Sequence, residues 1–187
     1  MKNTLVLSAV IFTIGFVAFP VIWGDDSFRW GQWGEYKHRE TNIASLGYPI
    51  YQEECGSCHM VYPPGLLPAT SWTKLMAGLD HHFGDNAELD TETIQSLSEY
   101  ILSNSADQSK YRRSQKFMRS LSADNVPIRI SETPYFRHEH DEIPLRIVSG
   151  NVKIQSFSNC NACHLRAEEG SFNEHEILIP GYGRWDD

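Results

Sequence analysis

Every cysteine of this chain lies in one of two short motifs that share the same spacing. The chain has four cysteines; in each motif two of them enclose two other residues and are followed directly by a histidine. Two thiols at this spacing can form thioethers with the two vinyl groups of one porphyrin, and the following histidine is then held under the iron as its proximal ligand. The two motifs, of the form C-x-x-C-H, therefore predict two covalently attached haem c groups. They are Cys55-Gly56-Ser57-Cys58-His59 and Cys160-Asn161-Ala162-Cys163-His164.

Zinc and disulfides are the other common uses of paired cysteines, and both fit this sequence less well. A zinc site of four thiolates can be built from two C-x-x-C pairs, but zinc does not require a histidine after both second cysteines. Residues 59–159 separate the two pairs, which is far beyond the spacing of a zinc finger or ribbon. Disulfides are tolerated in exported proteins, but a bond within C-x-x-C closes a tight loop and constrains little of the chain. We therefore favour haem, with zinc and disulfides as the alternatives.

Length and charge limit the kinds of protein to consider. A chain of 187 residues is long enough for one domain or two small ones. Its formal net charge is −8. Contacts with nucleic-acid phosphates need an excess of Lys and Arg on one face, so we expect no nucleic-acid partner. A basic or neutral protein partner fits an acidic chain better.

An apolar run near the N-terminus predicts export. Residues 5–23 are almost all apolar, so residues 1–24 are interpreted as a signal peptide or an N-terminal membrane anchor. We favour cleavage after Gly24, because a polar stretch begins directly after it. Bacteria attach haem to C-x-x-C-H outside the inner membrane, so we expect a periplasmic protein that is either soluble or anchored to the inner membrane. Residues 25–45 are interpreted as a polar arm.

Residues 46–104 are predicted to form a first haem domain. A short helix leads into the first motif, and the proline-rich residues 62–68 are expected to form an ordered loop. Ser71 is predicted to cap a helix that begins at Trp72, and Asp90 to cap a second helix. The predicted buried stripe of the second helix is Ile94, Leu97 and Ile101.

The first of these helices carries a candidate for the sixth iron ligand. His82 borders its apolar stripe, whereas His81 projects to the opposite, polar side. An iron held by one histidine needs a second axial ligand, so His82 is the distal candidate for the first haem and His81 the runner-up. Met76 is a competing ligand, because Met/His ligation is common and raises the reduction potential. Its place on the apolar stripe indicates core packing instead.

The second half of the chain is predicted from weaker signals. Residues 105–126 are polar and basic and are interpreted as a linker or an exposed helix, followed by a second haem domain over 127–187. Its basic side chains are expected to face solvent, with docking to an acidic partner or pairing with haem propionates as the alternatives; they are Lys110, Arg112, Arg113, Lys116 and Arg119. We expect a short strand at 127–130 and a helix that begins at Thr133-Pro134. A further short strand is expected at 177–179.

The expected helix after Pro134 carries the second distal candidate. His140 shares a face with Phe136 and Ile143, whereas His138 points elsewhere among charged residues. His140 is therefore the distal candidate for the second haem, with His138 behind it. His175 lies between two glutamates and is an outside candidate.

Four stretches of the sequence, in this order, resemble the bacterial dihaem cytochrome c family: ECGSCHMVYPPGLLPATSW, MAGLDHHFGDNAELD, ETPYFRHEHDEIP and CNACH. The resemblance covers about residues 47–180. It implies a mainly α fold, in which an N-terminal half like a class I cytochrome c precedes an irregular, mostly non-repetitive haem-binding half. It also implies two histidine ligands for each iron, which by position are His59 and His82, then His140 and His164. Pairing each proximal histidine with its distal candidate nearest in sequence closes the shortest loops.

An iron with two protein ligands has no open position for a substrate. The leading interpretation is therefore a dihaem electron carrier, not an enzyme, that works by outer-sphere transfer. The rival interpretation is a dihaem peroxidase or another oxidoreductase in which one iron keeps an open position, and a haem sensor needs the same open position. The chain is short for a dihaem peroxidase and offers a distal candidate for both irons.

The resemblance also implies redox partners. The expected acceptor is a small oxygen-binding monohaem c-type cytochrome of the SHP type, and the expected donor is a membrane b-type cytochrome.

Overall fold

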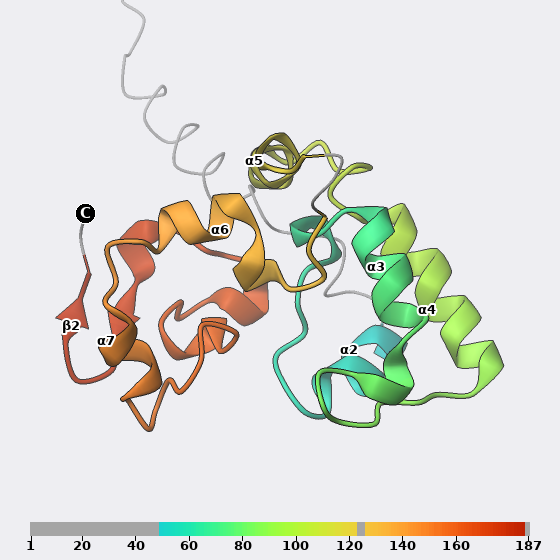
Figure 1. Ribbon diagram of the computed structural model, residues 1–187, viewed down its shortest axis with the longest axis horizontal. Coiled ribbons are helices and arrows are strands. Elements are labelled where there is room, and N and C mark those ends of the chain that lie inside the picture. The colour runs from blue at the N-terminus through green and yellow to red at the C-terminus, as the bar shows by residue number, and fades with distance from the viewer. Residues whose placement is uncertain (1–48, 123–125, 186–187) are drawn as a thin grey trace, which may run out of the picture.

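The structure of the protein, a computed structural model, describes residues 49–122 and 126–185. Helices make up nearly all of the regular structure of these residues, with one small two-stranded hairpin (Figure 1). The α-helices are α2 (Pro49–Gly56), α3 (Ala69–Met76), α4 (Thr91–Ser103), α5 (Arg112–Ser120), α6 (Pro134–Glu139) and α7 (Leu145–Ser149). The single-turn 3-10 helices are η2 (Pro64–Leu66), η3 (Leu79–His81), η4 (Ile130–Glu132), η5 (Cys160–Ala162), η6 (Ala167–Glu169) and η7 (Glu174–Glu176). The strands β1 (Leu178–Ile179) and β2 (Gly183–Arg184) pair in an antiparallel arrangement.

The core of the first half lies around α4. Leu97 and Ile101 of α4 are almost fully buried, with 0% and 1% of their surface exposed. They pack in one cluster with Tyr51 of α2, Trp72 of α3 and Leu67. Burial of apolar surface is the main favourable term in folding. This cluster therefore fixes α2, which carries the first cysteine of the first motif, against α3 and α4.

Helix α4 begins where the sequence predicted. The Asp90 side chain accepts hydrogen bonds from the backbone N–H groups of Glu92 and Thr93. The bond from the Thr93 hydroxyl, followed by the backbone bonds, lowers the pKa of the Asp90 carboxyl. Because an N-cap takes up N–H groups that have no partner within the helix, this boundary is set locally.

Helix α3 begins three residues earlier than predicted. It starts at Ala69 with Pro68 as its N-cap, so the prediction of a Ser71 cap before Trp72 is wrong. Ser71 is buried inside the helix, and its hydroxyl donates to the Pro127 carbonyl at 2.7 Å. A hydrogen bond to a distant segment has therefore replaced the local capping role that the sequence favours.

Helix α3 also ends earlier than the apolar stripe predicted. Its last residue is Met76, and the chain continues through Gly78 into the 3-10 turn η3. Glycine disfavours helix because it loses the most backbone entropy on folding. His82 follows η3 and so lies on a turn, which corrects its predicted position beside a helix face.

The proline-rich residues 62–68 are ordered and buried. They contain the single turn η2, and Leu66 and Leu67 have 3% and 1% of their surface exposed. The indole N–H of Trp72 donates to the Pro64 carbonyl at 2.8 Å. This segment therefore lines the interior, although its prolines prevent a longer helix.

The basic segment after α4 forms a helix, which was one of its two predicted interpretations, but one face of that helix is packed. Phe117 of α5 is 4% exposed and meets the Tyr135 ring edge to face, with 4.8 Å between ring centroids. Phe117 and Tyr135 form one cluster with Leu66 and Phe136. Helix α5 therefore packs against residues from both halves of the chain.

The strand predicted at 127–130 does not form. The Pro127 carbonyl accepts the Ser71 hydroxyl, and proline has no N–H to donate to a sheet. The chain continues into η4 instead. The short strand predicted at 177–179 is confirmed by β1, which pairs with β2 around a tight turn.

Helix α6 begins as predicted. The Thr133 hydroxyl accepts a hydrogen bond from the Phe136 N–H, and Pro134 takes the first helical position. The helix ends at Glu139, so His140 is its C-cap residue.

A separate buried cluster lies in the second half. Ile147 and Val148 of α7 pack there with Ile154 and with Ile179 of β1.

The remaining predictions about organisation are not tested by the described residues. None of the described helices is long and apolar enough to span a membrane. The predicted signal peptide or anchor at 1–24 and the polar arm at 25–45 lie outside the residues that the structure describes. The domain boundaries at 104 and 127 stay predictions, and the cluster that joins Leu66 to Phe117 crosses both of them.

Substitution of Leu97 tests the first core. We expect L97A to lower the free energy of unfolding of the holoprotein by about 2–5 kcal/mol, because it leaves a cavity in a fully buried cluster. Denaturant titration measures this change. The matched control is L145A on α7, where the leucine is 66% exposed and the expected change is within about 0.5 kcal/mol. Equal losses in the two variants would contradict this account of the core.

Candidate haem sites

The first C-x-x-C-H motif lies at the end of α2. Cys55 is on the last turn of this helix and is partly buried, whereas Cys58 is exposed in the turn that follows. A side chain at Gly56 would meet Cγ2 of Val61 at 3.0 Å. The lack of a side chain at Gly56 therefore lets the chain fold back closely after the motif.

The ring of His59 is oriented by its own neighbour in the chain. Its Nδ1 lies 2.7 Å from the Met60 carbonyl oxygen. A carbonyl only accepts hydrogen bonds, so Nδ1 carries the proton and Nε2 keeps its lone pair. A hydrogen bond of this kind orients most metal-binding histidines and leaves the second nitrogen for the metal.

His82 lies opposite His59. The centroids of the two rings are 6.2 Å apart, and their planes differ by 24°. His82 lies on a tight turn, where its backbone forms an isolated antiparallel β-bridge with that of Asp85. Phe83 in this turn has a φ of 56°, a left-handed conformation that costs a side-chain-bearing residue about 1–2 kcal/mol. The Arg129 guanidinium lies 3.8 Å from the centroid of the Phe83 ring and so holds the turn from the other half of the chain.

The second motif lies on the 3-10 turn η5, and His164 faces His140 across a cavity. The centroids of these rings are 6.1 Å apart, and their planes differ by 65°. The Nδ1 of His140 lies 2.8 Å from the Phe136 carbonyl oxygen, so Nδ1 carries the proton of this ring and Nε2 keeps its lone pair. Phe136 stacks on His140 with 3.9 Å between ring centroids, and Phe157 meets His140 edge to face.

Both histidine pairs fit the two axial ligands of one metal ion. Metal–nitrogen bonds of histidine are about 2 Å long, so two imidazoles on opposite sides of a metal ion have ring centres about 6 Å apart. The observed separations of 6.2 Å and 6.1 Å agree with this value. The angle between the ring planes is free to differ between the sites, because each plane contains the axis through its ligand and the metal.

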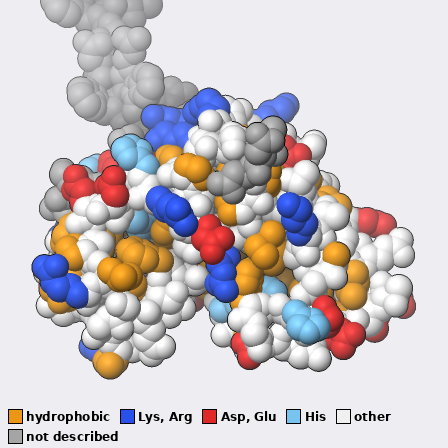
Figure 2. Space-filling view, viewed as in Figure 1, with side chains coloured by type: hydrophobic (Ala, Val, Ile, Leu, Met, Phe, Trp, Pro, Cys, Tyr) orange, Lys and Arg blue, Asp and Glu red, His pale blue; other side chains and the backbone are white. Residues whose placement is uncertain are grey.

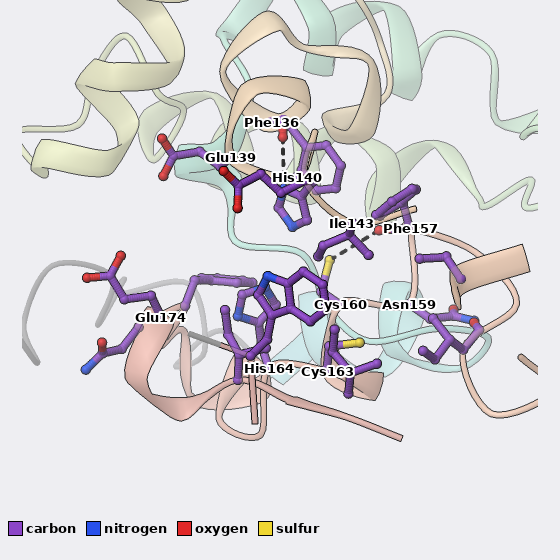
Figure 3. Close-up of a pocket in the computed structure, with 18 of the residues that line it drawn as sticks. Phe136, Glu139, His140, Ile143, Phe157, Asn159, Cys160, Cys163, His164 and Glu174 are labelled. Atoms are coloured by element: carbon purple, nitrogen blue, oxygen red, sulfur yellow. Dashed lines mark hydrogen bonds between the residues drawn. The ribbon is translucent and has the colours of Figure 1, made fainter. Parts of the chain in front are cut away.

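The second site has a cavity of the size expected for a bound cofactor. Its volume is about 370 Å³, within the usual range of small-molecule sites. Figure 3 shows His140 and His164 pointing toward each other from opposite sides of this cavity, with Cys160 and Cys163 beside them. The apolar part of the lining comes mainly from Phe136, Ile143, Ile147, Phe157, Phe172 and Trp185. This set of residues fits a flat, apolar ring system with a central metal.

Burial favours the neutral form of both the histidine rings and the cysteine thiols at these sites. Burial, followed by the charges of His140 and Arg113, lowers the pKa of His164 to about 4. Burial also lowers the pKa of His82, with a smaller effect from His59. Neutral imidazole is the form that binds metal. Burial raises the pKa of both Cys55 and Cys160 to about 11, so the two thiols stay protonated at neutral pH.

The alternative ligands from the sequence analysis lie away from these pairs. Met76 packs against the first core cluster. The side chains of His81, His138 and His175 are 88%, 80% and 66% exposed. Each of these histidines has an acidic side chain within 4 Å, as expected for surface residues.

The arrangement expected for a four-thiolate zinc site is not found. Within residues 49–122 and 126–185, no three histidine, cysteine, aspartate or glutamate side chains gather as they would around a metal ion. No disulfide joins any of the four cysteines, all of which lie among the described residues. The residues therefore form two separate sites, each with one cysteine pair and two facing histidines.

Two further residues lie next to these sites, and the sequence singled out neither of them. The Tyr62 ring lies 4.8 Å from His59, and its hydroxyl donates to the Ser158 carbonyl at 2.7 Å, beside the second motif. Tyr62 is three residues after the first motif, but the sequence does not indicate its hydrogen bond with the distant Ser158. Arg113 lines the cavity of the second site. The sequence analysis gave pairing with propionates only as an alternative for the whole basic run and did not distinguish Arg113 from its neighbours.

The sites and the fold can now be compared with known proteins. The sequence model described as dihaem cytochrome c matches residues 51–172. The chain is 42% identical to a diheme cytochrome type c from Shewanella baltica OS155, with a TM-score of 0.61, over 73% of this chain and 96% of that one. It is 44% identical to a diheme cytochrome c from Rhodobacter sphaeroides, with a TM-score of 0.60, over 67% of this chain and 96% of that one. No curated protein matches the chain.

The fold and the two attachment motifs define a c-type cytochrome with two haem sites. The chain belongs to the dihaem cytochrome c family, because the family's sequence model matches most of it. It therefore carries two covalently bound haem c groups, and electron transfer is the function that the family suggests.

Removing one cysteine pair tests how the haems are attached. We expect the double variant C160A/C163A to keep one covalent haem in place of two, because the second porphyrin then has no thiol to bind. Mass spectrometry of the denatured protein counts the covalent haems. S57A, which changes an intervening residue of the first motif, is the control and should keep both. Two covalent haems in C160A/C163A would contradict the assignment.

Proposed function

We propose that this protein is an electron carrier in which each haem iron has two histidine ligands, His59 with His82 and His140 with His164. The observation that carries the proposal is the pair of ring separations, 6.2 Å and 6.1 Å, each between the histidine of a C-x-x-C-H motif and a second histidine. In each pair one ring has its Nδ1 next to a backbone carbonyl, which supports Nε2 as the atom that binds iron. Cys55 with Cys58, and Cys160 with Cys163, attach the two porphyrins.

This ligation determines the chemistry. A haem with two strong protein ligands exchanges one electron and offers no position to a substrate. The chain's own residues then act by holding both rings in place, which keeps the structural change on oxidation small. Two histidines favour a lower reduction potential than histidine with methionine. The function is therefore outer-sphere electron transfer at low potential.

A peroxidase, another oxidoreductase or a haem sensor is the alternative. Each needs one iron with an open or weakly held position. The stacking of Phe136 on His140, at 3.9 Å between centroids, favours a firmly held distal ligand at the second site. At the first site, the Arg129 contact with Phe83 favours a fixed turn around His82.

The N-terminal half is proposed to be a shortened form of a class I cytochrome c domain. A helix that leads into the haem motif, followed by an irregular segment and two packed helices, is the order of elements in that class. Helices α2, α3 and α4 follow this order. The Met loop of the class is replaced by the turn that carries His82.

Carbon monoxide tests the ligation. We expect the visible spectrum of the reduced holoprotein to stay unchanged when carbon monoxide is added, because both axial positions are closed. H82A and H140A should each open one iron, so each variant should bind carbon monoxide at one haem. Binding to the unaltered protein would overturn the proposal and favour the peroxidase or sensor.

The structure offers matched controls for this experiment. His81 is the direct neighbour of His82, and His138 lies two residues before His140, but both are largely exposed. H81A and H138A should therefore leave the spectrum unchanged with and without carbon monoxide. An opened iron in either control variant would mean that the distal ligand is misassigned.

We further propose that the protein works in the periplasm, either soluble or anchored to the inner membrane through residues 5–23. The covalent haems support this compartment, since bacteria attach haem c outside the inner membrane. A membrane b-type cytochrome is the proposed donor, and a small oxygen-binding monohaem c-type cytochrome of the SHP type is the proposed acceptor.

Rapid mixing tests the acceptor. The reduced protein, mixed with an oxidised SHP-type cytochrome, should pass electrons to it at a rate that rises with acceptor concentration. A small class I cytochrome with a His/Met haem is the comparison, and the proposed acceptor should react faster. Equal rates with both would remove the support for a specific partner.

A further inference from the structure

Arg113 carries a positive charge beside the second haem site. It lines the cavity between His140 and His164 together with Tyr135 and Phe172. Within the described residues no carboxylate lies within ion-pair distance of its guanidinium, and its Nε is buried without a hydrogen-bond partner. A cation that is removed from water without a counter-ion is costly, so a negative group at this place would stabilise the protein.

The guanidinium is held in place by both walls of the cavity. Its Nη2 donates to the Phe172 carbonyl at 3.1 Å, and its Nη1 donates to the Tyr135 hydroxyl at 3.4 Å. Tyr135 belongs to α6, the helix whose C-cap residue is His140, and the Phe172 ring contacts His164 at 5.4 Å between centroids. Arg113 therefore joins the distal and proximal sides of the second site, with a fixed position and donors left over.

The other charges at the cavity indicate where a negative group would lie. Basic side chains gather on the surface around α5 (Figure 2). Arg112 and Lys116 of this helix also line the cavity, and Lys116 Nζ lies 5.3 Å from the centroid of the Tyr135 ring. The acidic side chains at the cavity are Glu139, Glu142 and Glu174, and Figure 3 shows Glu139 and Glu174 on the same side of it. The Tyr135 hydroxyl, which accepts from Arg113, donates to the Glu139 carboxylate at 3.0 Å, so one carboxylate also lies near the α5 wall. Arg112, Arg113 and Lys116 bring three positive charges to this wall, and an anion next to Arg113 is therefore still favoured.

We propose that Arg113 is the counter-ion of the second haem, whose propionate carboxylate it binds. The proposal rests on the second haem site described above. A haem brings its own two carboxylates into the cavity, and a guanidinium binds a carboxylate through two parallel N–H donors. The bound cation also offsets negative charge next to the iron, which favours the reduced state. Arg113 is thus a cofactor-binding residue that raises the reduction potential of the second haem.

Reduction potentials of the holoprotein test this role. We expect R113Q to lower the potential of the second haem and to leave that of the first unchanged, since the charge lies at one site only. Spectroelectrochemical titration measures both potentials, and the C160A/C163A variant, which keeps only the first haem, identifies which is which. The visible spectrum should keep the form of the unaltered protein, because no axial ligand is touched.

A matched control separates this effect from the loss of any positive charge. Arg119 lies on the same helix, is exposed and does not line the cavity of the second site. R119Q should therefore leave both potentials unchanged. An unchanged second potential in R113Q, or equal shifts in R113Q and R119Q, would overturn the proposal.

A conservative variant keeps the test decisive if R113Q does not fold with both haems. R113K retains the charge but loses the two-pronged donor geometry. We expect R113K to lower the second potential relative to the unaltered protein, because an ammonium group cannot bind a carboxylate through two parallel donors, and no decrease would overturn the proposal. The measurement is independent of the carbon monoxide experiment. Carbon monoxide binding to the unaltered protein would contradict the proposed histidine ligation. The role of Arg113 would still be decided by the reduction potentials of its variants.

Discussion

The structure depends on one distance, the separation of about 6 Å at which two imidazole rings can bind the same metal ion. Each C-x-x-C-H motif fixes only one of the two rings. In the proposed ligation a second ring must come from elsewhere in the chain and be held in place, because water can replace a histidine on a loose segment. The observed separations of 6.2 Å and 6.1 Å show that the fold meets this condition twice. Most of the packed elements serve to hold one of the four rings.

The two halves meet this condition by different means. In the first half, the cluster around Leu97 and Ile101 fixes α2 and α3, and a tight turn after α3 carries His82. That turn contains Phe83 in a left-handed conformation, which the contact with Arg129 helps to hold. In the second half there is little regular structure, and His140 is held instead as the C-cap of a short helix, stacked on Phe136. The same chemical site therefore does not need the same fold, which agrees with the lack of an internal repeat beyond the motifs.

The halves are also joined by contacts that connect the two sites. Tyr62 lies against His59 and donates a hydrogen bond to Ser158, two residues before the second motif. Leu66 packs with Phe117 and Phe136, and Ser71 donates to Pro127. Arg113 then joins both sides of the second site. For an electron carrier, such contacts fix the sites relative to each other, so that little rearrangement accompanies the loss or gain of an electron.

The sequence by itself determined the features that depend on neighbouring residues. The C-x-x-C-H motifs carry their chemistry within five positions, and Asp90 and Thr133 cap α4 and α6 through bonds that span two or three residues. The short strand at β1 and the helical character of the basic segment also followed from local patterns. The distal candidates His82 and His140 lie opposite the motif histidines, although His82 lies on a turn and not beside a helix face, and their role as iron ligands stays a prediction.

Only the tertiary structure decided the features that depend on distant partners. Ser71 is a good cap by its type, yet a carbonyl from residue 127 takes its hydroxyl, so α3 begins at Ala69 and no strand forms at 127–130. The basic run gave no sign that Phe117 is buried, and it did not show which of its basic side chains lines a haem site. The physical reason is the same in each case. Hydrogen bonds and burial between segments far apart in the chain outweigh local preferences of about 1 kcal/mol, and a single sequence records only the latter.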